Sequence, residues 1–225
     1  MAIWDDVITE RDKLVYKAAG HGAERVGFGQ KPVLVVIDVT YEFTGDKPEP
    51  ILESIKRFPK SSGEESWRAI YQIASLLPVA REKHVPIVYT AMAKGLTPEG
   101  WLRTKSARGP AYNSAKNYEI VREIAPTEKD IVIRKSRASI FFGTPLLSIL
   151  NSLKADTLLI CGGITSGCVR ASVTDAFAYN YRVIVIEEAT FDWGQMSHRI
   201  NLFDMNTKYA DVLSVTEVMD YLREL

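Results

Sequence analysis

Residues 33–37 form a continuous apolar run, Val-Leu-Val-Val-Ile, that ends at Asp38. Such a run, rich in β-branched residues, is typical of a central parallel strand that is buried on both faces. Comparable runs recur along the chain, and segments with helical spacing separate them. Strands that alternate with helices predict an α/β fold. We therefore expect three α/β/α layers around a six-stranded, mostly parallel, Rossmann-like sheet.

The remaining elements follow from the same periodicity. Further strands are expected at 85–90, 130–135, 157–161, 181–186 and 211–215. Helices are expected at 4–19, 64–83, 144–153, 169–179, 197–208 and 216–222. Pro78 should kink or divide the second of these helices. Residues 41–63 and 93–129 lack a clear period and are interpreted as loop insertions, the second with a helix near 119–124. Insertions of this length in a compact domain are usually functional.

Length, charge and cysteine content limit the class of protein. With 225 residues, the chain fits one domain over 29–225 behind an N-terminal arm over 1–28. The arm is charged and poor in apolar residues, so it needs a surface to lie on, and a second subunit is one candidate. Acidic and basic residues balance, which argues against nucleic acid or an anionic membrane as a partner. Two cysteines, no bilayer-length apolar run and no signal-peptide pattern predict a cytoplasmic protein.

The most informative segment is 162–170, Gly-Gly-Ile-Thr-Ser-Gly-Cys-Val-Arg, which directly follows an expected strand. A helix is expected to start at Cys168. A thiol at a helix N-terminus feels the positive end of the helix dipole, which lowers its pKa. Cys168 is therefore a candidate nucleophile. The alternative interpretation is a small buried cysteine that packs its helix against the sheet.

Two more reactive side chains follow expected strands. Asp38 and Lys135, like Cys168, lie at the carboxyl ends of strands. In a parallel sheet these ends share one edge, so the three side chains can converge there. Each residue alone also has a structural interpretation. Asp38 could cap a loop, and Lys135 could be a solvated charge on the surface.

Taken as a set, the motifs resemble the isochorismatase-like cysteine hydrolases, a superfamily that includes nicotinamidase. The matching positions are 35–38, Lys135, Ser139, 141–144, 163–172, Asp175, Ala176, 201–204 and 208–212. The last stretch is similar to the branch that contains N-carbamoylsarcosine amidohydrolase and maleamate amidohydrolase. The resemblance covers nearly the whole chain from about residue 27.

The resemblance implies a catalytic triad of Asp38, Lys135 and Cys168. In this scheme Cys168 attacks a carboxamide or ureido carbonyl, Asp38 shuttles the proton and Lys135 stabilises the thiolate. The family also has a cis peptide bond at the position of Gly163–Ile164. That bond would turn the Ile164 amide toward the Cys168 amide, so that both form an oxyanion hole.

The resemblance also implies substrate contacts. Candidate substrate-binding residues are Phe43, Phe142, Thr165 and Trp193. Relatives have a Gly-Asp-Arg-like turn whose arginine can grip a substrate carboxylate, whereas this chain reads Phe-Asp-Trp at 191–193. Trp193 offers an apolar or stacking wall instead. Other candidate cations are Lys94, Arg103 and Arg199.

No metal or cofactor is expected. Nicotinamidases hold a metal with Asp and His ligands, but this chain has three widely spread histidines and no Asp-x-His pair. The spacing of Ser197, His198 and Asp204 does not favour a second hydrolytic triad, so these residues are interpreted as structural. Arg170 is expected to form a structural ion pair, with Asp175 or a neighbouring subunit.

The sequence thus predicts a cofactor-free cysteine amidohydrolase that cleaves the C–N bond of a small linear amide or ureido substrate and releases ammonia. The family resemblance implies a homodimer or homotetramer. One alternative is an amidase for an uncharged or aromatic amide, which Trp193 favours. Another is a catalytically silent relative that only binds a ligand or partner.

Overall fold

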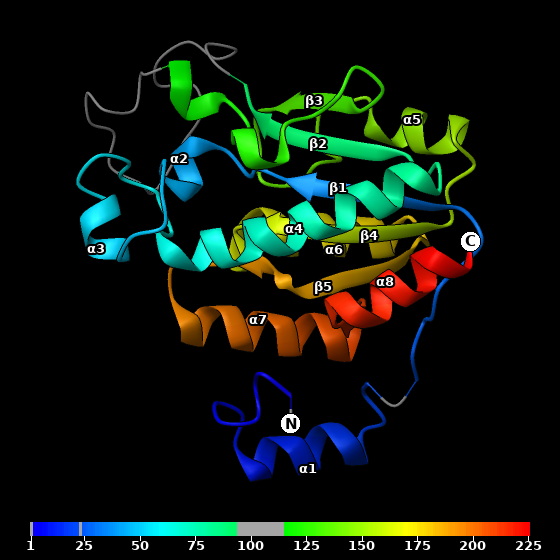
Figure 1. Cartoon of the computed structure of the whole chain (residues 1–225). Helices are drawn as coiled ribbons and strands as arrows, with labels where there is room; N and C mark the ends of the chain where they lie inside the picture. Colours follow the sequence, from blue (N-terminus) through cyan, green and yellow to red (C-terminus); the bar gives the residue numbers. More distant parts are fainter. Residues whose placement is uncertain (1, 23, 94–114) are drawn as a thin grey trace.

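The sheet has six strands, and all pairings between them are parallel, in the order β3-β2-β1-β4-β5-β6 (Figure 1). A computed structural model describes residues 2–22, 24–93 and 115–225. The strands are β1 (Pro32–Ile37), β2 (Ile87–Met92), β3 (Ile131–Lys135), β4 (Thr157–Gly163), β5 (Arg182–Phe191) and β6 (Asp211–Leu213). The expected Rossmann-like α/β class is confirmed.

Helices cover both faces of the sheet and complete the three layers. One face packs against α4 (Glu64–Glu82) and α8 (Val215–Glu224). The other face packs against α5 (Leu146–Ser152), α6 (Arg170–Ala178) and α7 (Gln195–Lys208). Every residue of β1 and β4 is buried, which explains why both strands read as continuous apolar runs. No helix in the described part of the chain is long and apolar enough to cross a membrane.

Helix α4 continues through Pro78, so of the expected kink or division the division does not occur. Proline lacks the amide hydrogen that an interior helical position normally donates. The helix nevertheless keeps one buried face, with Ile70, Ile73 and Leu77 packed in the core. Burial of that face on the sheet outweighs the single lost hydrogen bond, so the helix is not divided.

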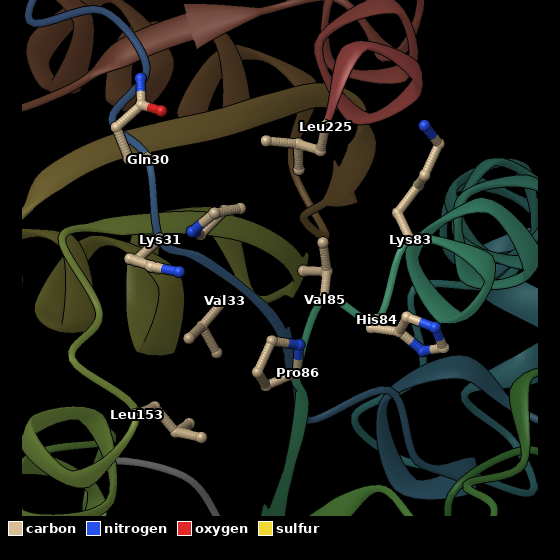
Figure 2. A pocket seen from close by; sticks show the side chains of 10 residues that line it. Gln30, Lys31, Val33, Lys83, His84, Val85, Pro86, Leu153 and Leu225 are labelled. Carbon is tan, nitrogen blue, oxygen red and sulfur yellow. The ribbon is translucent and has the colours of Figure 1, made fainter.

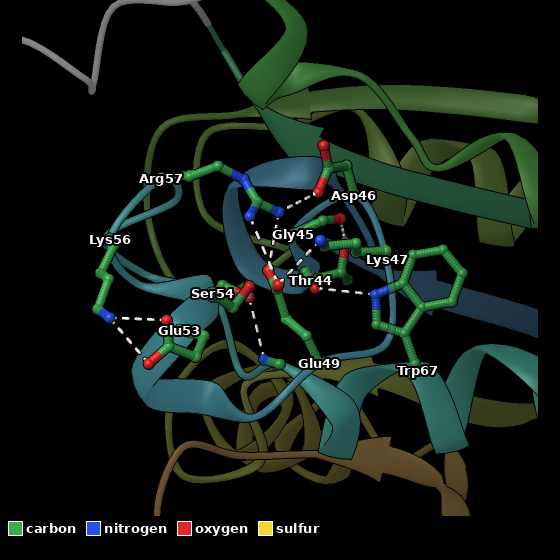
Figure 3. Close-up of polar contacts among 12 residues, drawn as sticks. Thr44, Gly45, Asp46, Lys47, Glu49, Glu53, Ser54, Lys56, Arg57 and Trp67 are labelled. Atoms are coloured by element: carbon green, nitrogen blue, oxygen red, sulfur yellow. Dashed lines mark hydrogen bonds and ion pairs between the residues drawn. The ribbon is translucent and has the colours of Figure 1, made fainter.

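The insertion at 41–63 is not an irregular loop, and this expectation was wrong. It contains two single-turn helices, α2 (Tyr41–Thr44) and α3 (Ile51–Ser54). Figure 3 shows what holds the segment: Arg57 binds Asp46 at 2.5 Å and Glu49 at 2.7 Å. The Trp67 indole of α4 also donates a hydrogen bond to the Thr44 carbonyl at 3.1 Å. One helical turn is too short to produce a period in the sequence.

The second insertion also differs from expectation where it is described. The single helix expected near 119–124 is replaced by two 3-10 turns, η2 (Ala115–Tyr118) and η3 (Arg122–Ile124). Between them, Ile120 forms an isolated antiparallel bridge with Thr40. The bridge ties this segment to the chain that leaves β1.

The N-terminal arm lies against α7 of its own chain (Figure 1). Its helix α1 (Glu10–Ala18) is shorter than the expected 4–19. The Tyr16 ring meets the Phe203 ring of α7 edge to face, with 4.9 Å between centroids. Trp4 contacts the same ring at 6.2 Å. The surface that the arm needs is therefore provided by α7.

Candidate active site

Three side chains that follow three strands meet at the carboxyl edge of the sheet, two of them buried and that of Cys168 partly exposed. The Lys135 ammonium lies 2.6 Å from Asp38 Oδ2 and 3.3 Å from Cys168 Sγ. The side chains of Asp38 and Lys135 are fully buried. The structure thus brings together the three residues that the sequence placed at this edge.

The strand register explains how Asp38 and the cysteine segment meet. Ile37 is paired with Gly162 of β4 and with Thr90 of β2, so Asp38 leaves the sheet between these two neighbours. Asp38 has a φ of 51°, which is uncommon for a residue with a side chain. Thr90 fixes it there: the Thr90 hydroxyl donates to Asp38 Oδ1 at 3.0 Å, and the Asp38 amide donates to the Thr90 carbonyl at 3.1 Å.

Backbone carbonyls complete the surroundings of the lysine. Lys135 is the last residue of β3, and its ammonium donates to the carbonyls of Arg137 at 3.0 Å and Ala138 at 3.2 Å. The chain after β3 therefore curls back over its own side chain. These contacts, with Asp38 and Cys168, hold the charge in a fixed position.

Cys168 lies within a helical turn rather than at its start. A π-helical turn spans Thr165–Val169 and continues into α6, so helical structure begins three residues earlier than expected. Gly162 has a φ of 102°, and a Cβ atom there would collide with the Ile37 carbonyl oxygen. Only glycine fits this close approach of β4 to β1. The Gly163–Ile164 peptide bond is cis, as the resemblance implied.

Asp192 binds the cysteine turn from the neighbouring strand, and the sequence analysis gave it no role. It follows β5 and is buried. Its carboxylate accepts hydrogen bonds from the Ser166 amide at 2.7 Å and the Trp193 amide at 2.8 Å. The available signal was an acidic residue directly after a strand, at the edge that already carried Asp38.

Two serines join the segment after Lys135 to the helix after Cys168. The Ser172 hydroxyl donates to the Cys168 carbonyl at 2.6 Å and accepts from the Ile140 amide at 3.1 Å. Ser139 donates to the Asp175 carboxylate at 2.5 Å. These motif residues therefore position the segment after Lys135 against the helix that follows Cys168.

Arg170 has a different partner from the one expected. Its guanidinium donates to the Asn201 side chain at 2.5 Å and lies 3.4 Å from the Asp204 carboxylate. Asp175 is occupied by Ser139, so the expected pair between Arg170 and Asp175 does not form. The pairs join α6 to α7 within one chain.

Burial and the charges of neighbouring groups shift the pKa values of both Lys135 and Cys168. Burial alone would lower the pKa of Lys135, but the negative charge of Asp38 and the hydrogen bonds of the ammonium outweigh it and raise that pKa. Burial, supported by the Asp38 charge, raises the pKa of Cys168 to about 12, although Lys135 opposes this. The resting group is therefore a thiol, the opposite of the expected lowered pKa. Such a thiol needs a base before it can act as a nucleophile.

The expected substrate-binding residues fall into three environments. Phe43 and Trp193 lie together, with ring centroids 6.4 Å apart. The Thr165 side chain is fully buried and hydrogen-bonded to the Phe191 carbonyl at 3.0 Å and to His198 Nδ1 at 2.9 Å. Phe142 is 64% exposed.

Of the three candidate cations for a substrate carboxylate, the structure describes one. Arg199 is ion-paired with Asp6 of the N-terminal arm. Lys94 and Arg103 lie outside the described residues. The expected structural role of His198 agrees with its buried hydrogen bond to Thr165.

A groove of about 340 Å³ lies at the other edge of the sheet (Figure 2). Its lining includes Pro32 and Val33 at the start of β1, and Val85 and Pro86 just before β2. Reactive groups of parallel sheets gather at carboxyl ends, so the candidate site is not in this groove. Over residues 2–22, 24–93 and 115–225, no three His, Cys, Asp or Glu side chains are grouped to hold a metal ion.

Comparison with known proteins decides the family. Residues 32–217 match the isochorismatase domain. The chain belongs to the isochorismatase family. This membership agrees with the resemblance and with the parallel sheet, and it makes the protein a member of a hydrolase family whose homologues include amidohydrolases.

Three relatives illustrate the range of the isochorismatase family around this chain. It is 30% identical to maleamate amidohydrolase of Pseudomonas putida over 92% of this chain and 93% of that one. It is 29% identical to N-carbamoylsarcosine amidase of an Arthrobacter species, over 89% of this chain and 75% of the relative. The structure of N-carbamoylsarcosine amidase from Thermoplasma acidophilum superposes with a TM-score of 0.64 at 26% identity, covering 83% and 97% of the two chains.

Proposed function

We propose that this protein is a cysteine amidohydrolase that cleaves the C–N bond of a small linear amide or ureido compound and releases ammonia. The observation that supports this most is the position of the Lys135 ammonium, 2.6 Å from Asp38 and 3.3 Å from Cys168. A nucleophile, a proton carrier and a fixed cation within contact of each other are the groups that acyl transfer requires.

In the first half of the proposed reaction, the Asp38 carboxylate takes the proton from the Cys168 thiol as sulfur attacks the carbonyl carbon. The carbonyl oxygen becomes an oxyanion that the amides of Ile164 and Cys168 stabilise. Asp38 then gives its proton to the nitrogen of the leaving group. The C–N bond breaks, ammonia leaves, and Cys168 holds the rest of the substrate as a thioester or thiocarbamate.

In the second half, a water molecule replaces ammonia. Asp38, again a carboxylate, takes a proton from that water as its oxygen attacks the thioester or thiocarbamate. The C–S bond breaks, and Asp38 returns the proton to the sulfur. In this scheme Lys135 stays the cation of the site and transfers no proton.

The relatives support a linear amide or ureido substrate. The names of two relatives, maleamate amidohydrolase and N-carbamoylsarcosine amidase, describe one substrate of each class. A second candidate function is hydrolysis of an uncharged or aromatic amide. The observation that favours it is Trp193, which is 44% exposed beside Phe43 and offers a ring face for stacking.

The test is ammonia release over a panel of N-carbamoyl amino acids, maleamate, aliphatic amides and nicotinamide. Turnover of a linear amide or an N-carbamoyl compound is the expected result. Turnover of nicotinamide alone would favour the aromatic amide. A chain that releases ammonia from none of these would favour a relative that binds a ligand without hydrolysing it.

We also propose a cytoplasmic enzyme that works as a homodimer or homotetramer. Both cysteines are free thiols, which suits a reducing compartment. Met196 and Ile200 expose apolar side chains on the first turns of α7, which suits contact with another subunit. Light scattering coupled to size-exclusion chromatography would measure the mass, and a monomeric mass would contradict the assembly.

A further inference from the structure

A buried chain of hydrogen bonds joins α7 to the helical turn that carries Cys168. Nδ1 of His198, in α7, lies 2.9 Å from the Thr165 hydroxyl oxygen, and that hydroxyl donates to the Phe191 carbonyl at 3.0 Å. Both side chains are buried, so these bonds are made within the protein and not to solvent. Thr165 is the first residue of the turn, so the chain of bonds ends on the segment that holds the proposed nucleophile.

The chemistry of the three groups fixes the direction of both hydrogen bonds. A carbonyl oxygen can only accept, so the single hydroxyl hydrogen of Thr165 is used on Phe191. The Thr165 oxygen must then accept from His198, which places a hydrogen on Nδ1 of the ring. Burial lowers the pKa of His198 to about 4, so the ring is neutral at pH 7 and carries no second hydrogen on Nε2. His198 is therefore held as the Nδ1–H tautomer.

The turn is bonded to the end of β5 at two successive residues. The Thr165 hydroxyl binds the Phe191 carbonyl, and the Ser166 amide binds the Asp192 carboxylate at 2.7 Å. The bond to Asp192 starts from a backbone amide, whereas the bond to Phe191 starts from a hydroxyl that can rotate. His198 removes that freedom, because the hydroxyl keeps both of its bonds in only one orientation.

The same turn spaces the two amides of the proposed oxyanion hole. The Ile164 carbonyl accepts from the Gly167 amide at 2.9 Å and from the Val169 amide at 3.2 Å. Ile164 is thus bonded to both residues that flank Cys168, and Thr165 follows Ile164 directly. A shift of Thr165 would therefore move the Ile164 amide relative to the Cys168 amide, and both must lie within hydrogen-bond distance of the oxyanion to stabilise it.

We propose that His198 is a positioning residue for the hydrolysis: as the Nδ1–H tautomer it holds the Thr165 hydroxyl on β5, and so keeps the amides of Ile164 and Cys168 aligned on the oxyanion. This role rests on the proposed amidohydrolase function. His198 acts through Thr165 and not on the substrate itself.

The experiment compares His198→Asn with His198→Leu, which introduce side chains of the same branched shape. The Asn side-chain amide can donate from near the position of Nδ1, whereas Leu has no donor. With the best substrate of the amide panel, His198→Leu should lower kcat by about 10- to 100-fold with little change in KM, because the lost alignment matters in the transition state. His198→Asn should keep most of the wild-type kcat.

A double-mutant cycle tests whether His198 acts through Thr165. Thr165→Val keeps the shape of the side chain and removes the hydroxyl, so it should lower kcat about as much as His198→Leu. The two changes combined should cost little more than either alone, because both remove the same chain of bonds. Equal kcat for His198→Asn and His198→Leu, or full additivity in the cycle, would overturn the positioning role.

A measurement on the wild type needs no turnover. In protein labelled with ¹⁵N at its three histidines, the chemical shifts of the ring nitrogens at pH 7 report which nitrogen is protonated. The ring signals that disappear in His198→Asn should show a protonated Nδ1 and an unprotonated Nε2, and the opposite tautomer would overturn the proposal. A wild type with the expected tautomer that releases no ammonia from the panel would instead overturn the proposed function, and the hydrogen-bond chain would remain.

Discussion

Asp38 has two opposite effects on Cys168. Its charge, together with burial, raises the pKa of the thiol, yet in the proposed reaction its carboxylate removes the thiol proton. A nucleophile that is protonated at rest and deprotonated only as it attacks is protected from alkylation and oxidation, because the thiolate is the reactive form.

We therefore predict that Asp38→Asn separates thiolate formation from turnover. The change removes the negative charge and leaves Lys135 beside the sulfur, so the pKa of Cys168 falls and alkylation by iodoacetamide at pH 7 becomes faster. Ammonia release should fall by about 100-fold or more, because the proton carrier is lost. Slower alkylation in the variant would contradict this view of Asp38.

His198 makes the fold sensitive to acid. Burial lowers its pKa to about 4, with a smaller contribution from Arg199, while Asp192 acts in the opposite direction. The unfolded chain takes up a proton near the ordinary pKa of 6.5, and the folded chain does so only near 4. The stability from the neutral ring is therefore present above about pH 6.5 and is lost as the pH falls to about 4.

We predict that His198→Asn flattens this part of the pH profile. Over the full interval, the wild type should lose about 3 kcal/mol of unfolding free energy through this group, and the variant should not. Urea denaturation at pH 7 and pH 4.5 measures the difference. Equal losses in the two proteins would show that His198 does not link folding to protons.

At the residue scale, the sequence predicted which side chains lie together better than it predicted their pKa values. The convergence of Asp38, Lys135 and Cys168 was predictable because carboxyl ends of parallel strands share one edge. The direction of the shift in the pKa of Cys168 was not, because it depends on burial and on the distance to Asp38, which the sequence does not give.

The helical turn that carries Cys168 is held by hydrogen bonds to residues outside the turn. Its cysteine carbonyl accepts from Ser172, and its Ser166 amide donates to Asp192. The sequence indicated a glycine-rich turn before a helix, but it could not show the π-helical turn or the tether from β5. Both depend on contacts between residues that are far apart in the chain.

We predict that Asp192→Ala loosens this turn. The change leaves the amides of Ser166 and Trp193 without their acceptor, which should lower the unfolding free energy by about 2–4 kcal/mol. A turn displaced by even 1 Å should lower kcat by about 10- to 100-fold.

Asp220→Ala is the matched control, since that carboxylate is exposed on α8 and pairs with Arg223 at 3.2 Å. It should change stability by less than about 0.5 kcal/mol and leave kcat unchanged. If both variants lost activity equally, Asp192 would have no special role in holding the turn.

At the scale of the whole molecule, the regular alternation of strand and helix patterns made the fold class predictable from the sequence. The single-turn helices and the position of the N-terminal arm were not predictable in this way. The sheet class followed from apolar runs separated by helical spacing. The single-turn helices α2 and α3 gave no such period, and the surface for the N-terminal arm became evident only with α7 in place.

We predict that Tyr16→Ala weakens the attachment of the arm to α7. Loss of the edge-to-face contact with Phe203 should lower the unfolding free energy by about 1–2 kcal/mol without changing kcat. Leu14→Ala, at a position that is 66% exposed, is the control and should have little effect. If the loss for Tyr16→Ala depended on protein concentration, the arm would be docking on another subunit instead.

The central claim is that Cys168 carries the reaction through a covalent intermediate. The most direct measurement is the rate of ammonia release by the wild type and by Cys168→Ala on the best substrate of the amide panel. We predict a fall of at least about 10⁴-fold, because the nucleophile is removed and no other thiol lies in contact with Lys135 among the described residues. A variant that releases ammonia within tenfold of the wild-type rate would contradict it.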